Sequence, residues 1–207
     1  MKKVSIILPT FNEKDNVGKI YSSIVQQFAD ANEFEFEIIY VDDASPDNTI
    51  DEVKKLGEQD NRVKFVLMSK RFGDQPCLMA GLTYASGDVV ITMDSDLQHP
   101  PHYIPLMLQY WKSGYKKVLM KRQQEGHSSL FKKYSELFFY ALFKRMADID
   151  MPMRFSGFCL LDRKVIDALK VHKESDPFFR GLVSCVGFNE IILDYKEDFR
   201  AAGESKY

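Results

Sequence analysis

A chain of 207 residues is long enough to bury the core of one α/β domain, and its length argues against two independent domains. With 45% hydrophobic and 28% charged residues, the composition excludes a disordered or fibrous protein, and the net charge of −2 argues against general nucleic-acid binding. Three widely spaced cysteines without a CxxC pair argue against a disulfide framework and favour the cytoplasm, and no apolar run approaches the roughly 20 residues that span a bilayer.

The first half of the sequence alternates short apolar runs with helical patterns, which is typical of βαβ units and a mostly parallel sheet. After the basic start MKK, the first apolar run ends at Pro9 without a small-residue cleavage site, so we interpret it as a strand and not as a signal peptide. The predicted strands are Val4–Leu8, Glu37–Val41, Val63–Met68 and Asp88–Met93, and the predicted helices are Asn16–Gln27, Thr49–Gln59 and Gln75–Ala85.

The second half continues this alternation and then becomes less regular. Its predicted elements are a helix at His102–Ser113, a strand at Lys117–Met120, a helix at Leu130–Met146, a strand at Gly157–Leu161, helices at Arg163–Leu169 and Pro177–Val186, and a strand at Glu190–Tyr195. We therefore expect a single α/β domain over residues 1–207, with a mostly parallel central sheet flanked by helices.

Polar side chains follow three of the predicted strands directly. Pro9–Glu13 comes after the first strand, Asp42–Ser45 after the second and Asp94–Asp96 after the fourth. In open α/β sheets the ligand crevice lies outside the carboxyl ends of the parallel strands. The sequence thus predicts that these three segments converge in space.

The segment MDSDLQHPP places Asp94 and Asp96 two residues apart, with the amide oxygen of Gln98 two residues further on. A divalent cation stabilises like charges held this close, and Mg²⁺ and Mn²⁺ prefer oxygen ligands that substrate phosphates often complete. A solvated acidic turn is the alternative, and on this motif alone it is favoured. A zinc site at His99 and His102 is disfavoured, because two prolines separate them and no cysteine is near.

The acidic pair Asp42 and Asp43 admits two interpretations. Its carboxylates could accept hydrogen bonds from a nucleobase or from ribose hydroxyls, or they could form a turn and cap the next helix. Taken alone, turn formation is favoured, and Pro9–Glu13 is equally ambiguous. Their shared place at one predicted edge shifts the balance towards a ligand.

Five segments of the chain form a recognisable series: LPTFNE, VDDASPDNT, RFGDQPCLMAGLTYASGD, MDSDLQHPP and RAAGESKY. In this order they resemble the inverting family-2 glycosyltransferases with a GT-A fold, and among these the dolichyl- and polyprenyl-phosphate sugar transferases. The resemblance runs from about Val4 to Tyr207. It implies a nucleotide-sugar-binding half at about residues 1–100 and an acceptor-binding half at about 101–207.

The resemblance also implies roles for the matching positions. The nucleotide sugar would be bound by Pro9, Thr10, Glu13, Asp42, Asp43, Asp94 and Ser95. Mg²⁺ or Mn²⁺ would be held against the diphosphate by Asp94, Asp96 and Gln98. Catalysis would depend on Asp96, Arg122 and Arg200, and phosphate or acceptor contacts on Arg180, Ser205 and Lys206.

The sequence departs from this family on the acceptor side. Where many relatives read GDFRL, it reads SGFCL, so that the acidic residue is Gly157 and the arginine is Cys159, and a further family arginine is Glu125. A hydroxyl acceptor needs a general base, such as Asp148 or Asp150, whereas a phosphomonoester is already anionic at neutral pH. The changes therefore fit a lipid-phosphate acceptor better than a sugar hydroxyl.

A basic stretch surrounds the predicted helix Leu130–Met146. Between Lys112 and Arg145 there are nine Lys or Arg residues against two glutamates, four of them on the polar side of this helix: Lys132, Lys133, Lys144 and Arg145. Such a helix suits an anionic membrane surface, or equally a core or oligomer contact. The resembling transferases often continue into membrane helices after SKY, so we expect a catalytic piece of a longer protein, at the inner face of the membrane.

We thus expect a metal-dependent inverting glycosyltransferase that moves a sugar from a nucleotide sugar to a polyprenyl phosphate. A UDP-sugar is the favoured donor and GDP-mannose stays open. The alternatives are transfer to a saccharide hydroxyl in polysaccharide synthesis, and a nucleotide-binding domain without transferase activity. The sequence leaves the sugar and the oligomeric state undetermined.

Overall fold

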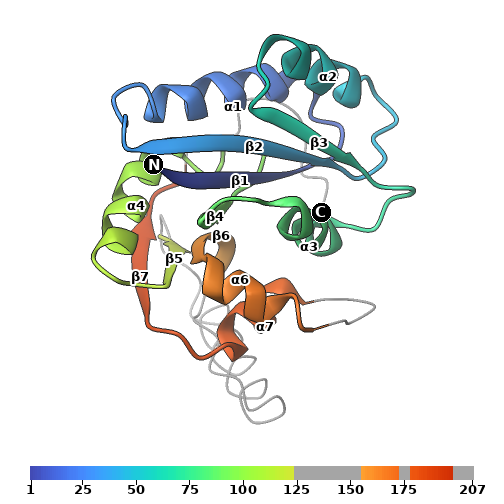
Figure 1. Cartoon of the computed structure of the whole chain (residues 1–207). Coiled ribbons are helices and arrows are strands. Elements are labelled where there is room, and N and C mark those ends of the chain that lie inside the picture. The colour runs from blue at the N-terminus through green and yellow to red at the C-terminus, as the bar shows by residue number, and fades with distance from the viewer. Residues whose placement is uncertain (124–154, 173–177, 198–207) are drawn as a thin grey trace.

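The structure is a computed structural model that describes residues 1–123, 155–172 and 178–197. In these residues seven strands form one sheet in the order β3-β2-β1-β4-β6-β5-β7 (Figure 1). Strands β1 to β4 are parallel to one another, β7 is parallel to β5, and β6 is antiparallel to both of its neighbours. The strands are β1 Lys2–Thr10, β2 Phe34–Asp42, β3 Val63–Leu67, β4 Val89–Thr92, β5 Lys117–Arg122, β6 Phe155–Asp162 and β7 Glu190–Tyr195.

Helices cover both faces of the sheet (Figure 1). They are α1 Lys14–Gln27, α2 Thr49–Gln59, α3 Asp74–Tyr84, the 3₁₀ turn η1 Pro101–Tyr103, α4 Ile104–Lys112, α6 Arg163–Leu169 and α7 Phe179–Cys185. Along β1, Ile6 and Leu8 pack with α1 and α4 on one face, and Ile7 packs with α3, α6 and α7 on the other. Burial on both faces explains why the central strands are nearly continuous apolar runs.

Every strand and helix predicted within the described ranges is present, with ends that shift by a few residues. The helix predicted at His102–Ser113 is the one that differs in type: it starts with a 3₁₀ turn at Pro101, and the α-helix begins only at Ile104. Pro101 and Pro105 explain this, since proline lacks an N–H and is tolerated only in the first turn of a helix. The predicted helix Leu130–Met146 lies outside the described residues.

In the part of the chain that the structure describes, no helix is both long and apolar enough to cross a membrane.

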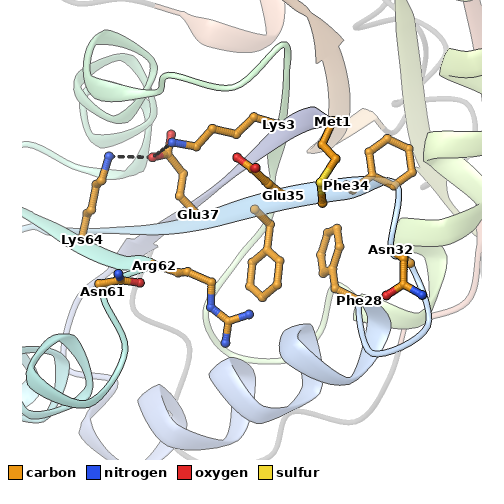
Figure 2. A pocket seen from close by; sticks show the side chains of 12 residues that line it. Met1, Lys3, Phe28, Asn32, Phe34, Glu35, Glu37, Asn61, Arg62 and Lys64 are labelled. Carbon is orange, nitrogen blue, oxygen red and sulfur yellow. Dashed lines mark hydrogen bonds and ion pairs between the residues drawn. The ribbon is translucent and has the colours of Figure 1, made fainter.

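A buried carboxylate, Glu37, joins the first halves of β1, β2 and β3. It accepts hydrogen bonds from Ser5 Oγ at 2.6 Å and from Ser86 N and Oγ at 2.8 Å, and it pairs with Lys64 at 2.6 Å and Lys3 at 2.9 Å. These lysines border a pocket of about 480 Å³ (Figure 2), and Phe28 and Phe36 also line it. The pocket lies at the edge where β1 to β3 begin, opposite the strand ends that carry the predicted site.

Glu37 predicts how stability depends on pH. Burial raises the pKa of its carboxyl, but hydrogen bonds from Lys64, Ser5, Ser86 and Lys3 outweigh burial and hold the pKa far below the usual range. A lowered pKa contributes stability that is present above the unfolded-state value of about 4.3 and is lost as the pH falls below it. We expect Glu37→Gln to flatten the acid loss of stability, measured by urea denaturation from about pH 7 down to about pH 3. The exposed Glu35→Gln is the control, and an unchanged acid limb in Glu37→Gln would refute the assignment.

Candidate functional site

The three polar segments meet at one edge of the sheet, as predicted. Thr10 stands beside Asp42 in the register of β1 and β2, and Asp43 N donates to Thr10 O at 2.9 Å. From the other side, Ser95 Oγ donates to Pro9 O at 2.9 Å. The ends of β1, β2 and β4 are therefore tied together by hydrogen bonds.

The loop after β1 is fastened to the loop after β2. Asn12 N donates to Ser45 Oγ at 3.0 Å, and Glu13 N donates to Thr49 Oγ1, also at 3.0 Å. The buried Glu13 carboxylate accepts from Asn16 Nδ2 at 2.5 Å. This network fixes the backbone of Pro9–Glu13 against the start of α2.

Asp42 and Asp43 are both buried, and both support loops. Asp42 accepts from Ser45 Oγ at 2.6 Å and from Ser45 N at 3.0 Å, which closes a local turn. Asp43 accepts from Phe72 N at 2.7 Å and Gly73 N at 2.8 Å, and so holds the loop between β3 and α3. Turn formation is thus observed for Asp42, Asp43 holds a distant loop, and direct contact of either with a nucleotide stays a prediction.

The loop that Asp43 holds carries a residue that sequence reasoning missed. The Arg71 guanidinium lies over the Phe11 ring, 4.2 Å from its centroid, with Arg71 exposed and Phe11 partly exposed. A cation over an aromatic face is a favourable contact that also leaves flat surfaces for stacking. The sequence contains enough information to predict this pair. Phe11 lies in the polar segment Pro9–Glu13, and Arg71 follows the third predicted strand, which ends at the same edge of the sheet.

Asp94 and Asp96 end β4 in a tight loop. The Asp94 side chain is 53% exposed, whereas Asp96 is buried and its Oδ1 accepts from Gln98 N at 3.0 Å. Among the described residues no group of three His, Cys, Asp or Glu side chains forms a complete metal site. The donor set of Asp94, Asp96 and Gln98 is all oxygen, which fits Mg²⁺ or Mn²⁺ with the remaining ligands from phosphate and water.

His99 and His102 do not form the disfavoured zinc site. The His99 ring is buried, and its Nδ1 accepts from Asp94 N at 2.9 Å. Burial, with a smaller effect of Arg122 and against the opposing effect of Asp96, lowers the pKa of His99 to about 4, so the ring is neutral. His102 is exposed and packs on Tyr103, with ring centroids 4.5 Å apart.

Residues with a strained backbone conformation cluster at this edge of the sheet. In the described ranges the non-glycine residues with positive φ are Asn12 at 55°, Ala44 at 56° and Leu97 at 68°. Each follows one of the three strands β1, β2 and β4. A left-handed conformation costs a non-glycine residue about 1 kcal/mol or more and tends to occur at functional sites.

Arg122, at the end of β5, borders the same edge. Its side chain is 57% exposed, and its Nη2 lies 2.5 Å from Oε2 of Glu197, which follows β7. Burial raises the pKa of Glu197, Arg122 lowers it, and Asp96 and Asp94 raise it, so this carboxylate belongs to the electrostatics of the site. Sequence reasoning missed Glu197 because only the pairing of β5 with β7 brings it here.

Arg180 and the two departures from the family pattern, which were predicted to lie on the acceptor side, lie around β6. Arg180 Nη1 donates to Phe155 O at 3.3 Å, and its buried Nε has no hydrogen-bond partner among the described residues. Gly157 has φ 92°, and a Cβ there would meet none of the described atoms within 4 Å. Cys159 is buried with Sγ 3.2 Å from Thr92 Oγ1, and burial raises its pKa to about 12, so it is a neutral thiol.

The remaining predicted site residues lie outside the described ranges. They are Arg200, Ser205 and Lys206, together with Glu125, Asp148 and Asp150.

Comparisons with known proteins agree with this geometry. The chain is 39% identical over 203 residues to the uncharacterized glycosyltransferase YkcC of Bacillus subtilis (strain 168), covering 98% of this chain and 62% of YkcC. It is 32% identical over 205 residues to a bactoprenol glucosyl transferase of Shigella phage SfV, covering 99% of this chain and 66% of that protein. The chain thus spans less than two thirds of the length of these curated relatives.

Solved structures share the GT-A fold. The mannosyltransferase PcManGT from Pyrobaculum calidifontis, in complex with GDP-Man and Mn²⁺, matches with a TM-score of 0.66 and 18% identity over 97% of this chain and 57% of that one. Glucosyl-3-phosphoglycerate synthase from Mycobacterium tuberculosis, in complex with Mn²⁺, UDP and glucosyl-3-phosphoglycerate, matches with a TM-score of 0.63 and 18% identity over 98% of this chain and 73% of that one. Residues 5–170 match the model of the family described as Glycosyl transferase family 2, and the chain belongs to that family.

Proposed function

We propose that this chain transfers a sugar, with inversion and with the help of Mg²⁺ or Mn²⁺, from a nucleotide sugar to a polyprenyl phosphate. One observation carries the proposal. The acidic loop Asp94–Asp96 is hydrogen-bonded to Pro9 near the end of β1, and the loop that follows β1 is hydrogen-bonded to the loop after β2, so that a diphosphate site and a nucleoside site would adjoin.

A UDP-sugar is the donor that we favour. Its base would lie near Phe11 and Arg71, whose stacked pair offers an aromatic face and a cation. Pro9, Thr10 and Glu13 would line the nucleoside side, and Asp42 and Asp43 would hold or contact it. GDP-Man in the similar PcManGT complex keeps guanosine open as the base.

Asp94, Asp96 and Gln98 would hold the cation against the donor diphosphate. The cation would stabilise the negative charge that develops on the leaving nucleoside diphosphate, which is worth several kcal/mol. Arg122 would add a second positive charge at the same edge. For this, the donor phosphate would replace Glu197 as the partner of the Arg122 guanidinium.

A phosphate acceptor suits the surroundings of Gly157. A phosphomonoester is largely dianionic at neutral pH and attacks without a general base, so no carboxylate is needed there. Among the described residues, open space adjoins Gly157 on β6, the strand next to β4, and the buried Nε of Arg180 on α7 has no hydrogen-bond partner. Both observations support an anionic acceptor on this side. The similarity to a bactoprenol glucosyl transferase supports a polyprenyl lipid as its carrier.

A lipid acceptor places the reaction at a membrane surface. Of the nine basic residues from Lys112 to Arg145, Lys117 is buried and paired with Glu190, and the other eight would attract anionic headgroups. We propose that the domain works at the cytoplasmic face of the membrane. Residues 1–100 would bind the donor, and residues 101–207 the acceptor.

Nucleotide binding without transfer is the second candidate. Gly157 and Cys159 favour this function, because neither residue supplies a charge that could act on an acceptor. Glycine has no side chain, and the Cys159 thiol is buried and neutral. Transfer to a sugar hydroxyl would need a base that neither residue provides.

Incubation with labelled UDP-glucose or GDP-mannose and Mn²⁺ tests these functions, with polyprenyl phosphate, polyprenol or an oligosaccharide as acceptor. Label that enters the organic phase only with polyprenyl phosphate supports the proposal. Label in an aqueous oligosaccharide supports the hydroxyl acceptor. Calorimetric binding of UDP with no transfer to any acceptor supports the non-catalytic domain.

A further inference from the structure

His99 contacts the acidic loop at two points. Its Nδ1 accepts from the Asp94 backbone N–H at 2.9 Å, and its Nε2 lies 3.5 Å from Oδ2 of the Asp94 carboxylate. Because Nδ1 is the acceptor, the proton of the neutral ring is on Nε2. The imidazole therefore holds the acidic loop by its backbone, close to the Asp94 carboxylate.

The ring itself is held by aromatic neighbours from distant parts of the chain. It stacks on Phe158 of β6, with centroids 5.0 Å apart and planes at 12°, and it meets the edge of Tyr195 of β7 at 5.7 Å. Phe158 and Tyr195 are fully buried and contact each other at 5.5 Å. Since the sheet fixes both rings, His99 is an immobile support for a loop whose acidic side chain is half exposed.

We propose that His99 is a positioning residue for the metal site: it fixes the Asp94 backbone, and through it the place of the Asp94 carboxylate that would bind the cation. This inference rests on the metal role in the proposed function. Residues that hold a metal ligand in place from behind are part of such sites, and loss of such a partner typically costs 10–100-fold in metal affinity or activity. His99 does not touch the substrate in this assignment.

A purely structural role for the ring is the competing explanation, and three variants separate the two. His99→Phe keeps an aromatic ring between Phe158 and Tyr195 but removes both nitrogens. His99→Asn places an oxygen close to the position of Nδ1, so it keeps an acceptor for the Asp94 N–H and loses the ring. His102→Phe makes the same exchange on the exposed neighbour and is the matched control.

The test measures three quantities: the Mn²⁺ concentration that gives half-maximal UDP binding by calorimetry, kcat at saturating Mn²⁺, and the hydrogen exchange of the Asp94 amide. In His99→Phe we expect the Mn²⁺ requirement to rise about tenfold or more, kcat at saturating Mn²⁺ to stay within a few-fold of wild type, and the Asp94 amide to exchange faster. In His99→Asn the amide should stay protected and the Mn²⁺ requirement should lie nearer to wild type. His102→Phe should match the wild type throughout.

The inference is overturned if a folded His99→Phe keeps the wild-type Mn²⁺ requirement or the wild-type Asp94 exchange. It is also overturned if kcat at saturating Mn²⁺ and the melting temperature fall together in both His99 variants, because that result is the signature of lost packing alone. A wild-type protein whose UDP binding ignores Mn²⁺ is a different result, since it removes the metal role from the proposed function and the inference with it.

Discussion

Replacing Asp96 with alanine is expected to lower kcat/KM for sugar transfer about a thousandfold. The carboxylate is buried in the loop after β4, and in the proposed function its loss removes a charge that holds the cation against the diphosphate. A cation that stabilises the leaving group by about 4 kcal/mol corresponds to about three powers of ten in rate. Initial rates over a range of UDP-sugar and Mn²⁺ concentrations measure the effect.

Two further variants sharpen this result. Asp96→Asn keeps the shape and an acceptor for Gln98 N but loses the charge, so it should be impaired nearly as much. Asp51→Asn removes an equal charge from the exposed surface of α2 and should be indistinguishable from wild type. Wild-type turnover in Asp96→Ala would contradict the metal role.

Asp43→Ala is expected to lower the free energy of unfolding by about 3 kcal/mol and to weaken UDP binding. The fully buried carboxylate accepts two backbone hydrogen bonds, from Phe72 and Gly73, and bonds to a charged group contribute about 1.5–3 kcal/mol each. Without them the loop that carries Arg71 loses its anchor. Urea denaturation and calorimetry with UDP measure the two effects.

The neighbour Asp42 provides the comparison. Its carboxylate binds Ser45 in a local turn and holds no loop from another strand, so Asp42→Ala should cost less stability. If Asp43→Ala kept wild-type stability and lost only UDP binding, Asp43 would be a direct nucleotide ligand and its loop-holding role would be minor.

The strand ends could be predicted because two local signals coincide there. Each of β1, β2 and β4 contains a buried apolar run, and polar residues such as Thr10, Asp42 and Asp94 lie at or just beyond its end. Parallel strands place such ends at one edge whatever the order of the strands in the sheet. The convergence therefore needed no knowledge of register.

The sequence could not decide between the two interpretations of Asp42 and Asp43. A carboxylate after a strand can bind a ligand or a nearby backbone N–H, and residue spacing is the same in both cases. Only the position of the loop after β3, which brings Phe72 and Gly73 to Asp43, identifies its partners.

Side-chain contacts that depend on the pairing of distant strands could not be predicted from the sequence. Glu197 reaches Arg122 only because β7 pairs in parallel with β5, although 75 residues separate the two side chains in the chain. In the same way, His99 is distinguished from a metal ligand by Phe158 and Tyr195, which come from β6 and β7. No local pattern near His99 carries that information.

Gly157 and Cys159, which differ from the family pattern, have structural roles that do not require loss of acceptor binding. Gly157 adopts a positive φ with open space beside it among the described residues, and Cys159 fills the core against Thr92. Neither position leaves a buried charge without a partner. In the proposed function this region binds the acceptor, and the lack of a carboxylate at 157 favours a phosphate acceptor over a hydroxyl acceptor.

The most direct test of the central claim is an anomalous diffraction measurement on crystals of this chain grown with UDP and Mn²⁺. The account predicts a manganese peak within coordination distance of the Asp94 and Asp96 carboxylates, with the UDP phosphates as its other ligands and the base beside Phe11. UDP bound at another edge of the sheet, or manganese bound away from Asp94 and Asp96, would contradict it.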